Sequence, residues 1–158
     1  MTIDKRAFRD ALGCFATGVT VVTTTTAEGG HLGLTANSFS SVSLDPPLVL
    51  FCLDNQASSF EAMTSGSGFC VNVLAADQRG LSERFADKDA DRFPEIPSHL
   101  SEAGHPIIEG ALAVIDCAGH AVHDGGDHAI IVGRVLSFEV MREATPLLYW
   151  RGRYRGLS

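Results

Sequence analysis

The amino-acid sequence predicts a mainly β protein, a small antiparallel barrel that carries a few short helices. Short runs of β-branched and aromatic residues are typical of strands, and segments rich in glycine and proline separate them. Helical spacing, by contrast, never extends over more than a few turns. Closing such a sheet into a barrel would remove its exposed edges. With 158 residues, 45% of them hydrophobic, the chain can bury a core and is expected to form one domain, residues 1–158.

The first expected element is an amphipathic helix near the N-terminus. Phe8, Ala11, Leu12 and Phe15 recur at a spacing of three to four residues, which places them on one helical face. Asp4 can cap the first turn, and Gly18 is expected to end the helix.

Strands are expected to follow. Residues 19–26, VTVVTTTT, are all β-branched and stiff at χ1, which favours a strand over a helix. Residues 27–30 contain two glycines and are expected to form the turn of a hairpin that returns through residues 31–35. Residues 48–53 form a continuous apolar run after two prolines, which is typical of a strand buried on both faces.

Two short helices are expected on either side of a strand at residues 69–74. The first would begin after Ser58 and Ser59, whose hydroxyls can cap it. The second would begin at Asp77 and carry Leu81 and Phe85 on one face.

The second half of the chain is expected to form a long hairpin. Residues 87–106 are charged and contain prolines, which indicates a surface excursion or a lid. Residues 111–123 and 129–141 are β-rich arms on either side of the glycine-containing tip at residues 124–127.

The charge balance limits the partners of this protein. The 19 acidic and 12 basic side chains give a net charge of −7, which argues against a nucleic-acid surface and against an anionic membrane. No apolar segment reaches the length of a membrane span and no secretion signal is recognisable, so a cytoplasmic protein is expected. The four cysteines are widely spaced and are interpreted as small reduced core residues, although a redox dithiol stays open.

Several reaction classes lack their motifs in this sequence. There is no GxGxxG that opens a helix, no P-loop, no HExxH and no GxSxG. His120 and His123 have no cysteine or carboxylate at a recognised metal-ligand spacing, so no metal is expected. Hydride transfer between cofactors fits these absences, because the cofactor supplies the reactive atoms and the protein supplies position and electrostatics.

The most informative stretch is residues 33–53, GLTANSFSSVSLDPPLVLFCL. It sets many short hydrogen-bonding side chains between two apolar segments, which suits a ligand that is polyanionic and multiply hydroxylated. A strand edge followed by a Pro-Pro turn would have a similar composition.

The order of several segments carries a family resemblance over nearly the whole chain. The opening TGVTVVTT, the core TANSFSSVSLDPPLVLFC and the GDH triplet at residues 126–128 are its most specific parts. In that order and spacing the chain resembles the short-chain flavin reductases, the small components of two-component flavin-dependent monooxygenases. The resemblance implies an FMN-binding split barrel and an NAD(P)H-dependent reductase that transfers a hydride to FMN or FAD. It further implies a homodimer and a partner monooxygenase that receives reduced flavin by diffusion.

The resemblance also implies which residues bind the flavin. Contacts to the ring, the ribityl chain and the phosphate would come from Thr35, Ala36, Asn37, Ser38, Cys52, Leu53, Asp54, Ser58 and Ser59. Backbone amides and hydroxyls near a helix start can bind phosphate, but capping of the helix explains the two serines equally well.

Two further residues complete the expected site. Phe85, with Lys88 or Arg92 nearby, would reach the outer part of the cofactor and could stack on the adenine of FAD, or it is an ordinary core residue. His128 of the GDH triplet is the expected catalytic residue, placed near the flavin and the incoming NADH or NADPH; a lone loop histidine is otherwise a polar surface residue.

The C-terminal segment interleaves Tyr149, Trp150 and Tyr154 with arginines. In an acidic chain, a strand beside the flavin site or a subunit contact is expected there rather than a nucleic-acid patch. Two other functions stay open: a tightly flavin-bound electron carrier or reductase of another acceptor, and a non-catalytic flavin-binding module.

Overall fold

The computed structural model of this chain describes residues 1–157, and its strands outnumber its helices. All strand pairs are antiparallel, which confirms the mainly β prediction. The elements in chain order are α1 (Lys5–Leu12), β1 (Thr17–Gly18), β2 (Thr20–Thr25), β3 (His31–Ala36), β4 (Ser40–Leu44), β5 (Pro47–Asp54), α2 (Phe60–Thr64), β6 (Phe69–Val73), the 3₁₀ turn η1 (Ala76–Gln78), α3 (Arg79–Ala86), β7 (Ser98–Leu100), β8 (Pro106–Ile108), β9 (Ala113–Asp124), β10 (His128–Val140), β11 (Leu148–Trp150) and β12 (Arg153–Arg155).

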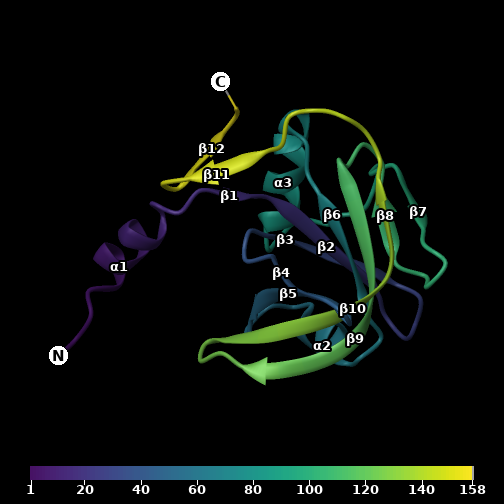
Figure 1. Cartoon of the computed structure of the whole chain (residues 1–158), viewed down its shortest axis with the longest axis horizontal. Helices are drawn as coiled ribbons and strands as arrows, with labels where there is room; N and C mark the ends of the chain where they lie inside the picture. Colours follow the sequence, from purple (N-terminus) through teal and green to yellow (C-terminus); the bar gives the residue numbers. More distant parts are fainter. Residues whose placement is uncertain (158) are drawn as a thin grey trace.

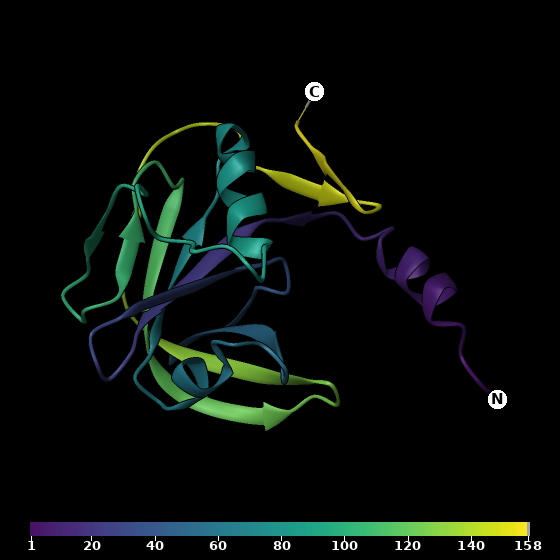
Figure 2. The same ribbon diagram turned by 180° about the vertical axis from the view of Figure 1, so that it is seen from behind.

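One seven-stranded sheet organises the fold, in the order β3-β2-β6-β9-β10-β5-β4 (Figures 1 and 2). The ladder ends at β3 and β4, and within residues 1–157 no strand pair joins these two ends. The sheet is therefore open, and the expected split barrel is not confirmed. Short strands form two further sheets, β1-β11-β12 and β7-β8.

The core shows that the open sheet bends over itself. Val22 of β2, Phe51 of β5, Phe69 of β6 and Ile131 of β10 are buried in one cluster. The rings of Phe51 and Phe69 meet edge to face, with centroids 4.9 Å apart. Hydrophobic burial across the sheet, rather than a closed hydrogen-bond ladder, holds its two halves together.

Helix α3 covers a second core cluster. Phe85 of α3 is fully buried there beside Val21, Leu74 and Ile108. A Cβ at Gly33 of β3 would lie only 2.7 Å from the Phe85 ring, so this close approach requires glycine. The contact fixes α3 against the end strand of the sheet.

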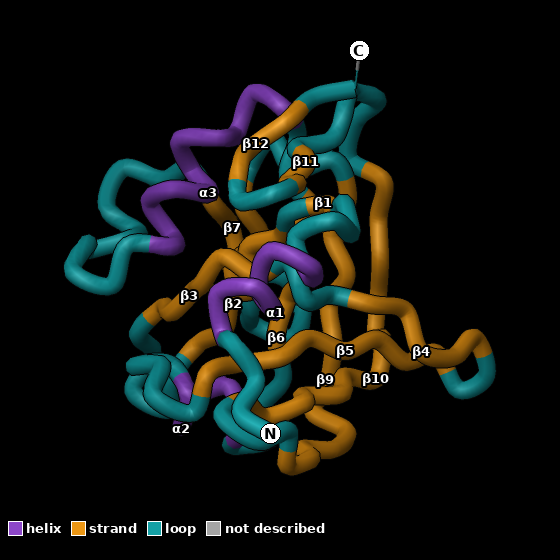
Figure 3. The backbone as a smooth tube through the Cα atoms, turned by 90° about the vertical axis from the view of Figure 1, so that its left-hand side faces the viewer, coloured by secondary structure: helices purple, strands orange, loops and turns teal. Residues whose placement is uncertain are grey.

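Helix α1 forms where the spacing predicted it. The carboxylate of Asp4 accepts the Arg6 N–H at 2.9 Å and caps the helix, as expected. The helix ends earlier than expected, at Leu12 rather than at Gly18, which lies in β1. It buries no residue and projects away from the sheet (Figures 1 and 2). In Figure 3, which is viewed from that side, α1 therefore lies in front of the strands.

Two predictions of local structure were wrong in detail. In β5 the side chains alternate between buried and partly exposed, so the strand is buried on one face and not on both. Asp77 does not cap α3: it lies in η1 and pairs with Arg142, whose hydrogen bond lowers the pKa of the Asp77 carboxyl. The ion pair engages the carboxylate that the cap would have needed.

The four cysteines are free and fall into two groups, one buried and one accessible. Cys70 and Cys117 are buried and unpaired, as expected, and burial raises the pKa of both thiols, that of Cys117 to about 12. Cys14 is exposed and Cys52 is only half-buried, so the prediction of a core position was wrong for these two. Cys14 follows a helix that itself buries nothing.

Within residues 1–157, no helix combines the length and the apolar character that crossing a membrane requires.

A buried pair ties the β7-β8 segment to β9. His105 and Asp116 are 4% and 3% exposed, and Nδ1 of His105 lies 2.6 Å from Oδ1 of Asp116. The other ring nitrogen lies 3.0 Å from the carbonyl oxygen of Ser67. Burial alone would lower the pKa of His105, but the hydrogen bonds to these two acceptors outweigh it and raise the pKa. Both ring nitrogens face acceptors, which is the pattern of a doubly protonated imidazolium.

The substitution Asp116→Asn should lower the free energy of unfolding by about 3 kcal/mol, because it leaves a buried imidazolium without its counter-charge. In the native protein the stabilisation is complete below the ordinary histidine pKa of 6.5 and is lost as the pH rises through the higher folded-state value. Urea unfolding from pH 5 to pH 9 should show this slope in the native protein and a flatter profile in the variant. His99→Asn, which breaks an exposed histidine-carboxylate pair, is the control. Equal losses in the two variants would contradict the assignment.

Candidate functional site

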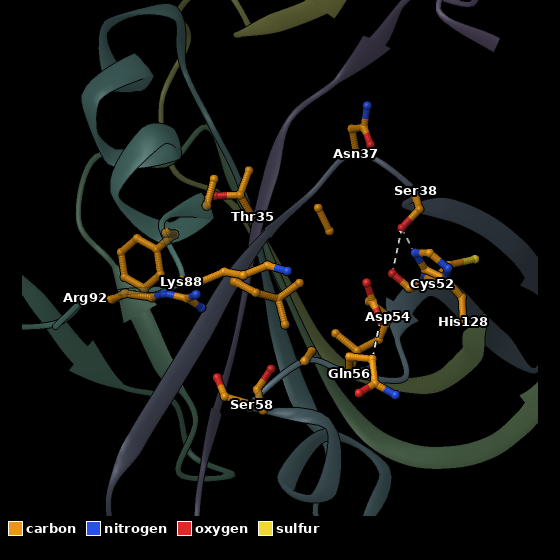
Figure 4. A pocket seen from close by; sticks show the side chains of 17 residues that line it. Thr35, Asn37, Ser38, Cys52, Asp54, Gln56, Ser58, Lys88, Arg92 and His128 are labelled. Atoms are coloured by element: carbon orange, nitrogen blue, oxygen red, sulfur yellow. Dashed lines mark hydrogen bonds between the residues drawn. The ribbon is translucent and has the colours of Figure 1, made fainter. Parts of the chain in front are cut away.

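A cavity of about 570 Å³ opens between the ends of β3 and β5, the segment that leads into α2, and the loop after α3 (Figure 4). Every residue that the sequence resemblance implied borders it: Thr35, Ala36, Asn37, Ser38, Cys52, Leu53, Asp54, Ser58, Ser59, Phe85 and His128. Lys88 and Arg92, which the sequence analysis named as alternatives, both border it. Four further bordering residues were not expected from the sequence: Leu34, Gln56, Ala57 and Ala86. Their only signal in the sequence was adjacency to the expected residues.

The link between Ser38 and Cys52 forms one wall. The backbone N–H of Cys52 donates to Oγ of Ser38 at 2.9 Å, and the Ser38 hydroxyl donates to the Cys52 carbonyl at 3.1 Å. This two-way contact joins the chain after β3 to the middle of β5, across the open part of the sheet. Because these two hydrogen bonds already use the Ser38 hydroxyl, Ser38 contributes to the cavity wall.

Thr35 and Asn37 play different parts. The Thr35 hydroxyl donates to the carbonyl of Ser82 in α3 at 2.6 Å, which commits it to holding the helix. Asn37 is exposed, and within residues 1–157 its amide makes no hydrogen bond to the protein. Asn37 therefore offers a ligand both a donor and an acceptor.

His128 reaches the cavity through the strand register. It lies directly opposite Asp54 in the β10-β5 pair, and the hairpin tip is fixed by the Asn55 N–H, which donates to the Asp127 carbonyl at 3.0 Å. Nδ1 of His128 lies 2.6 Å from a carboxylate oxygen of Asp127, and this hydrogen bond lowers the pKa of Asp127. With Nδ1 engaged, the imidazole, 43% exposed, presents Nε2 to a ligand.

The opposite end of the cavity carries hydroxyls and cations. Ser59 precedes α2 as its N-cap residue, yet its side chain makes no capping hydrogen bond. Lys88 points into the cavity (Figure 4). The Arg92 guanidinium is held by the carbonyls of Gly33 at 2.6 Å and Asp87 at 2.9 Å. Donors of both kinds suit a phosphate group.

Phe85 lies beneath the residues that form the surface of the cavity. The ring is 0% exposed and meets Phe93 edge to face, with centroids 5.2 Å apart. The geometry favours the core role over stacking on an adenine, because no part of the ring is open.

The residues that border the cavity fit a flavin by their chemistry. Amides and hydroxyls at one end can bind the edge and side chain of a heteroaromatic ring, and cations at the other end can bind a phosphate tail. Among residues 1–157 no group of three or more histidines, cysteines or carboxylates could hold a metal ion.

Comparison with known proteins also points to a flavin-binding protein. Residues 12–158 match the model of the flavin reductase like domain. The chain is 47% identical over 156 residues to the reductase subunit of a flavin-dependent monooxygenase from Rhodococcus jostii, covering 99% of this chain and 80% of that protein.

Solved structures agree in fold. The nitrilotriacetate monooxygenase component B homologue from Mycobacterium thermoresistibile superposes with a TM-score of 0.94 at 45% identity, covering 98% of this chain and 87% of that one. The NADH:FAD oxidoreductase of Streptomyces globisporus, solved with NAD and FAD fragments, superposes with a TM-score of 0.92 at 39% identity, covering 100% and 97%. The chain belongs to the flavin reductase like domain family.

Proposed function

We propose that this protein is an NAD(P)H-dependent flavin reductase that transfers a hydride to FMN or FAD and supplies the reduced flavin to a separate monooxygenase. The observation that carries the proposal is one cavity that has the amide of Asn37 and the imidazole of His128 at one end and the serine hydroxyls with the Lys88 and Arg92 cations at the other. Relatives named as reductase subunits of flavin-dependent monooxygenases and as an FMN reductase (NADH) support it.

The chain's residues divide the binding of the flavin between them. Asn37 and the backbone around Cys52 would hold the ring edge, while Ser58, Ser59 and Lys88 would hold the phosphate. Ala36 and Leu53, buried beside the cavity, give the ring an apolar wall. Phe85 shapes that wall from behind.

When both ligands are bound, the reduced nicotinamide supplies a hydride and the flavin ring accepts it. The protein's part is to hold the two rings face to face, which can lower the barrier by several kcal/mol, on the order of the proximity effects known for bound reactants. His128 would orient the nicotinamide through Nε2, while Asp127 fixes the imidazole by its contact with Nδ1.

Binding of FAD as well as FMN is supported by a second hollow beyond the phosphate end. It measures about 140 Å³ and shares Ser58, Ser59, Lys88 and Arg92 with the main cavity. His31 and Phe93 also border it, with ring centroids 5.6 Å apart. The longer tail of FAD could follow this path from the same anchoring cations.

The proposal includes the architecture and assembly that the family resemblance implied: one split-barrel domain that forms a homodimer. Exposed apolar side chains support the dimer. Leu136, Phe138 and Val140 of β10 are 56%, 77% and 74% exposed, on one face of the strand beyond its pairing with β5. Burying this apolar face against a second copy of the chain would be favourable, because it removes apolar surface from water.

The proposed activity predicts that purified protein oxidises NADH or NADPH anaerobically only when FMN or FAD is added, measured at 340 nm. Turnover that needs added flavin would support a diffusible-flavin reductase. Flavin that stays bound through gel filtration would favour an electron carrier, and flavin binding without oxidation of either nucleotide would favour a non-catalytic module.

Asn37→Ala should weaken flavin binding about fivefold, because it removes a hydrogen bond between the Asn37 amide and the flavin, and such a bond contributes about 1 kcal/mol. His128→Ala should leave the flavin Kd near its native value and raise the KM for the nicotinamide nucleotide. Flavin fluorescence titration and steady-state kinetics separate the two effects. His123→Ala is the control, since His123 lies on β9 opposite Ile130 and outside the cavity. Native values in both site variants would refute the assignment.

The proposed dimer predicts that Phe138→Asp shifts the sedimentation mass from two chains to one, because it places a charge in the apolar face. Leu100→Asp, at an exposed leucine of β7, should leave the mass unchanged. A native protein that sediments as a monomer would exclude the dimer.

A further inference from the structure

The tip of the β9-β10 hairpin brings His128 to the flavin cavity, yet none of the side chains of the tip is buried. Residues 124–127 are all exposed, and the tip extends to the edge of the molecule (Figures 1 and 2). The first buried side chain of β10 is the small methyl group of Ala129. A segment with so few buried contacts depends on its hydrogen bonds and fluctuates when they are lost. The direction of the His128 imidazole therefore depends on what the tip is bonded to.

Bonds within the turn fix its shape. The Gly125 N–H donates to the His128 carbonyl at 2.9 Å, and the Gly126 N–H donates to Oδ1 of Asp124 at 3.0 Å. Gly126 has a φ of +84°, in the left-handed region that favours glycine. A Cβ at Gly125 would lie 2.9 Å from the His128 carbonyl oxygen, so glycine is required there too. These contacts shape the turn, but they do not tie it to β5.

Asn55 ties the turn to the end of β5. Nδ2–H of Asn55 donates to the Gly126 carbonyl at 3.0 Å, and its backbone N–H donates to the Asp127 carbonyl at 3.0 Å. The two acceptors belong to the peptide groups on either side of Asp127. Asn55 therefore holds the backbone of Asp127 at both ends, directly before the chain enters His128. The strand register, with Asp54 opposite His128, continues the same connection.

The turn after β5 sets the position of Asn55 itself. The carboxylate of Asp54 accepts the Gln56 N–H at 2.8 Å, and the Asp54 carbonyl accepts the Ala57 N–H at 3.0 Å. Asp54 and Gln56 border the flavin cavity, whereas Asn55 between them does not. Asn55 thus faces the hairpin tip instead of a ligand, and it can act on a bound ligand through His128.

The contact between Asp127 and His128 needs this support. Nδ1 of His128 lies 2.6 Å from Oδ1 of Asp127, but the Asp127 side chain is 95% exposed. An exposed pair of this kind contributes little by itself, because water and salt screen the charges and holding both side chains costs entropy. Fixing the backbone of Asp127 from both sides reduces that entropy cost and keeps the carboxylate beside Nδ1.

We infer that Asn55 is a positioning residue of the reductase: it holds the two peptide groups around Asp127 and thereby directs Nε2 of His128 at the nicotinamide. The inference rests on the proposed reductase function and on the role proposed there for His128. Without the Asn55 amide, His128 keeps its place in β10, but its imidazole and the Asp127 carboxylate spend less time in the binding geometry. The serine hydroxyls and cations at the other end of the cavity are unaffected.

The kinetic test is a double-mutant cycle. Asn55→Ala should raise the KM for the nicotinamide nucleotide about threefold, as the fraction of correctly placed imidazole falls, and leave the flavin Kd at its native value. In the His128→Ala background the same substitution should have no further effect, because the imidazole is absent. Gln78→Ala is the matched control: the Gln78 amide also donates to a distant carbonyl, that of Glu109 at 3.1 Å, and lies outside the cavity. Additive losses in the double variant, or a native KM in Asn55→Ala, would overturn the inference.

NMR of the flavin-free protein tests the positioning even if the proposed enzyme activity fails. Long-range ¹H–¹⁵N spectra distinguish the two imidazole nitrogens, and in the native protein those of His128 should show Nδ1 carrying the proton that faces Asp127. In Asn55→Ala the His128 signals should move toward those of His123, an exposed histidine of the same hairpin, while Gln78→Ala keeps the native signals. Unchanged His128 signals in Asn55→Ala would overturn the inference. Changed signals in a protein that oxidises no nucleotide would support the positioning of His128 and refute the reductase function alone.

Discussion

The pairing of β5 with β10 is the constraint on which the cavity depends. It places His128 opposite Asp54 although the two residues lie in different halves of the sequence. One residue of slip would turn His128 to the other face of the sheet and separate it from Ser38 and Cys52. The register is held from both sides: Phe51 and Ile131 anchor it in the core, and Asn55 holds the hairpin tip by its bonds to Gly126 and Asp127.

The sheet is open where the site lies. Because β3 and β4 are not paired, the chain between them leaves the ladder and exposes Asn37, while Ser38 returns to β5 by its paired bonds with Cys52. Closing the ladder with hydrogen bonds would engage the same backbone groups that now border the cavity. The site therefore depends on the gap between β3 and β4, where side-chain contacts replace the backbone hydrogen bonds of a closed sheet.

Local patterns in the sequence predicted the elements that depend on short-range physics. The β-branched run became β2, the Asp4 cap and the apolar spacing became α1, and the residues with the family pattern line one cavity. Features that depend on distant partners were not predictable from the sequence alone. The role of Asp77 was decided by Arg142, 65 positions away, and Phe85 became a wall because Gly33 lets its ring approach. The sequence placed Lys88 or Arg92 near the cofactor without choosing between them, and the fold brings both to the cavity.

The four thiols of this chain differ in access in a way that follows from the fold. Burial keeps Cys70 and Cys117 protonated and out of reach. Cys14, by contrast, is exposed and borders a cleft between the last turn of α1 and the β11-β12 hairpin, and Cys52 lies in the wall of the flavin cavity. A thiol-directed reagent would therefore meet two positions, each beside a different hollow. The native sequence thus already carries two attachment points for spectroscopic labels, and each label would respond to what occupies the hollow next to it.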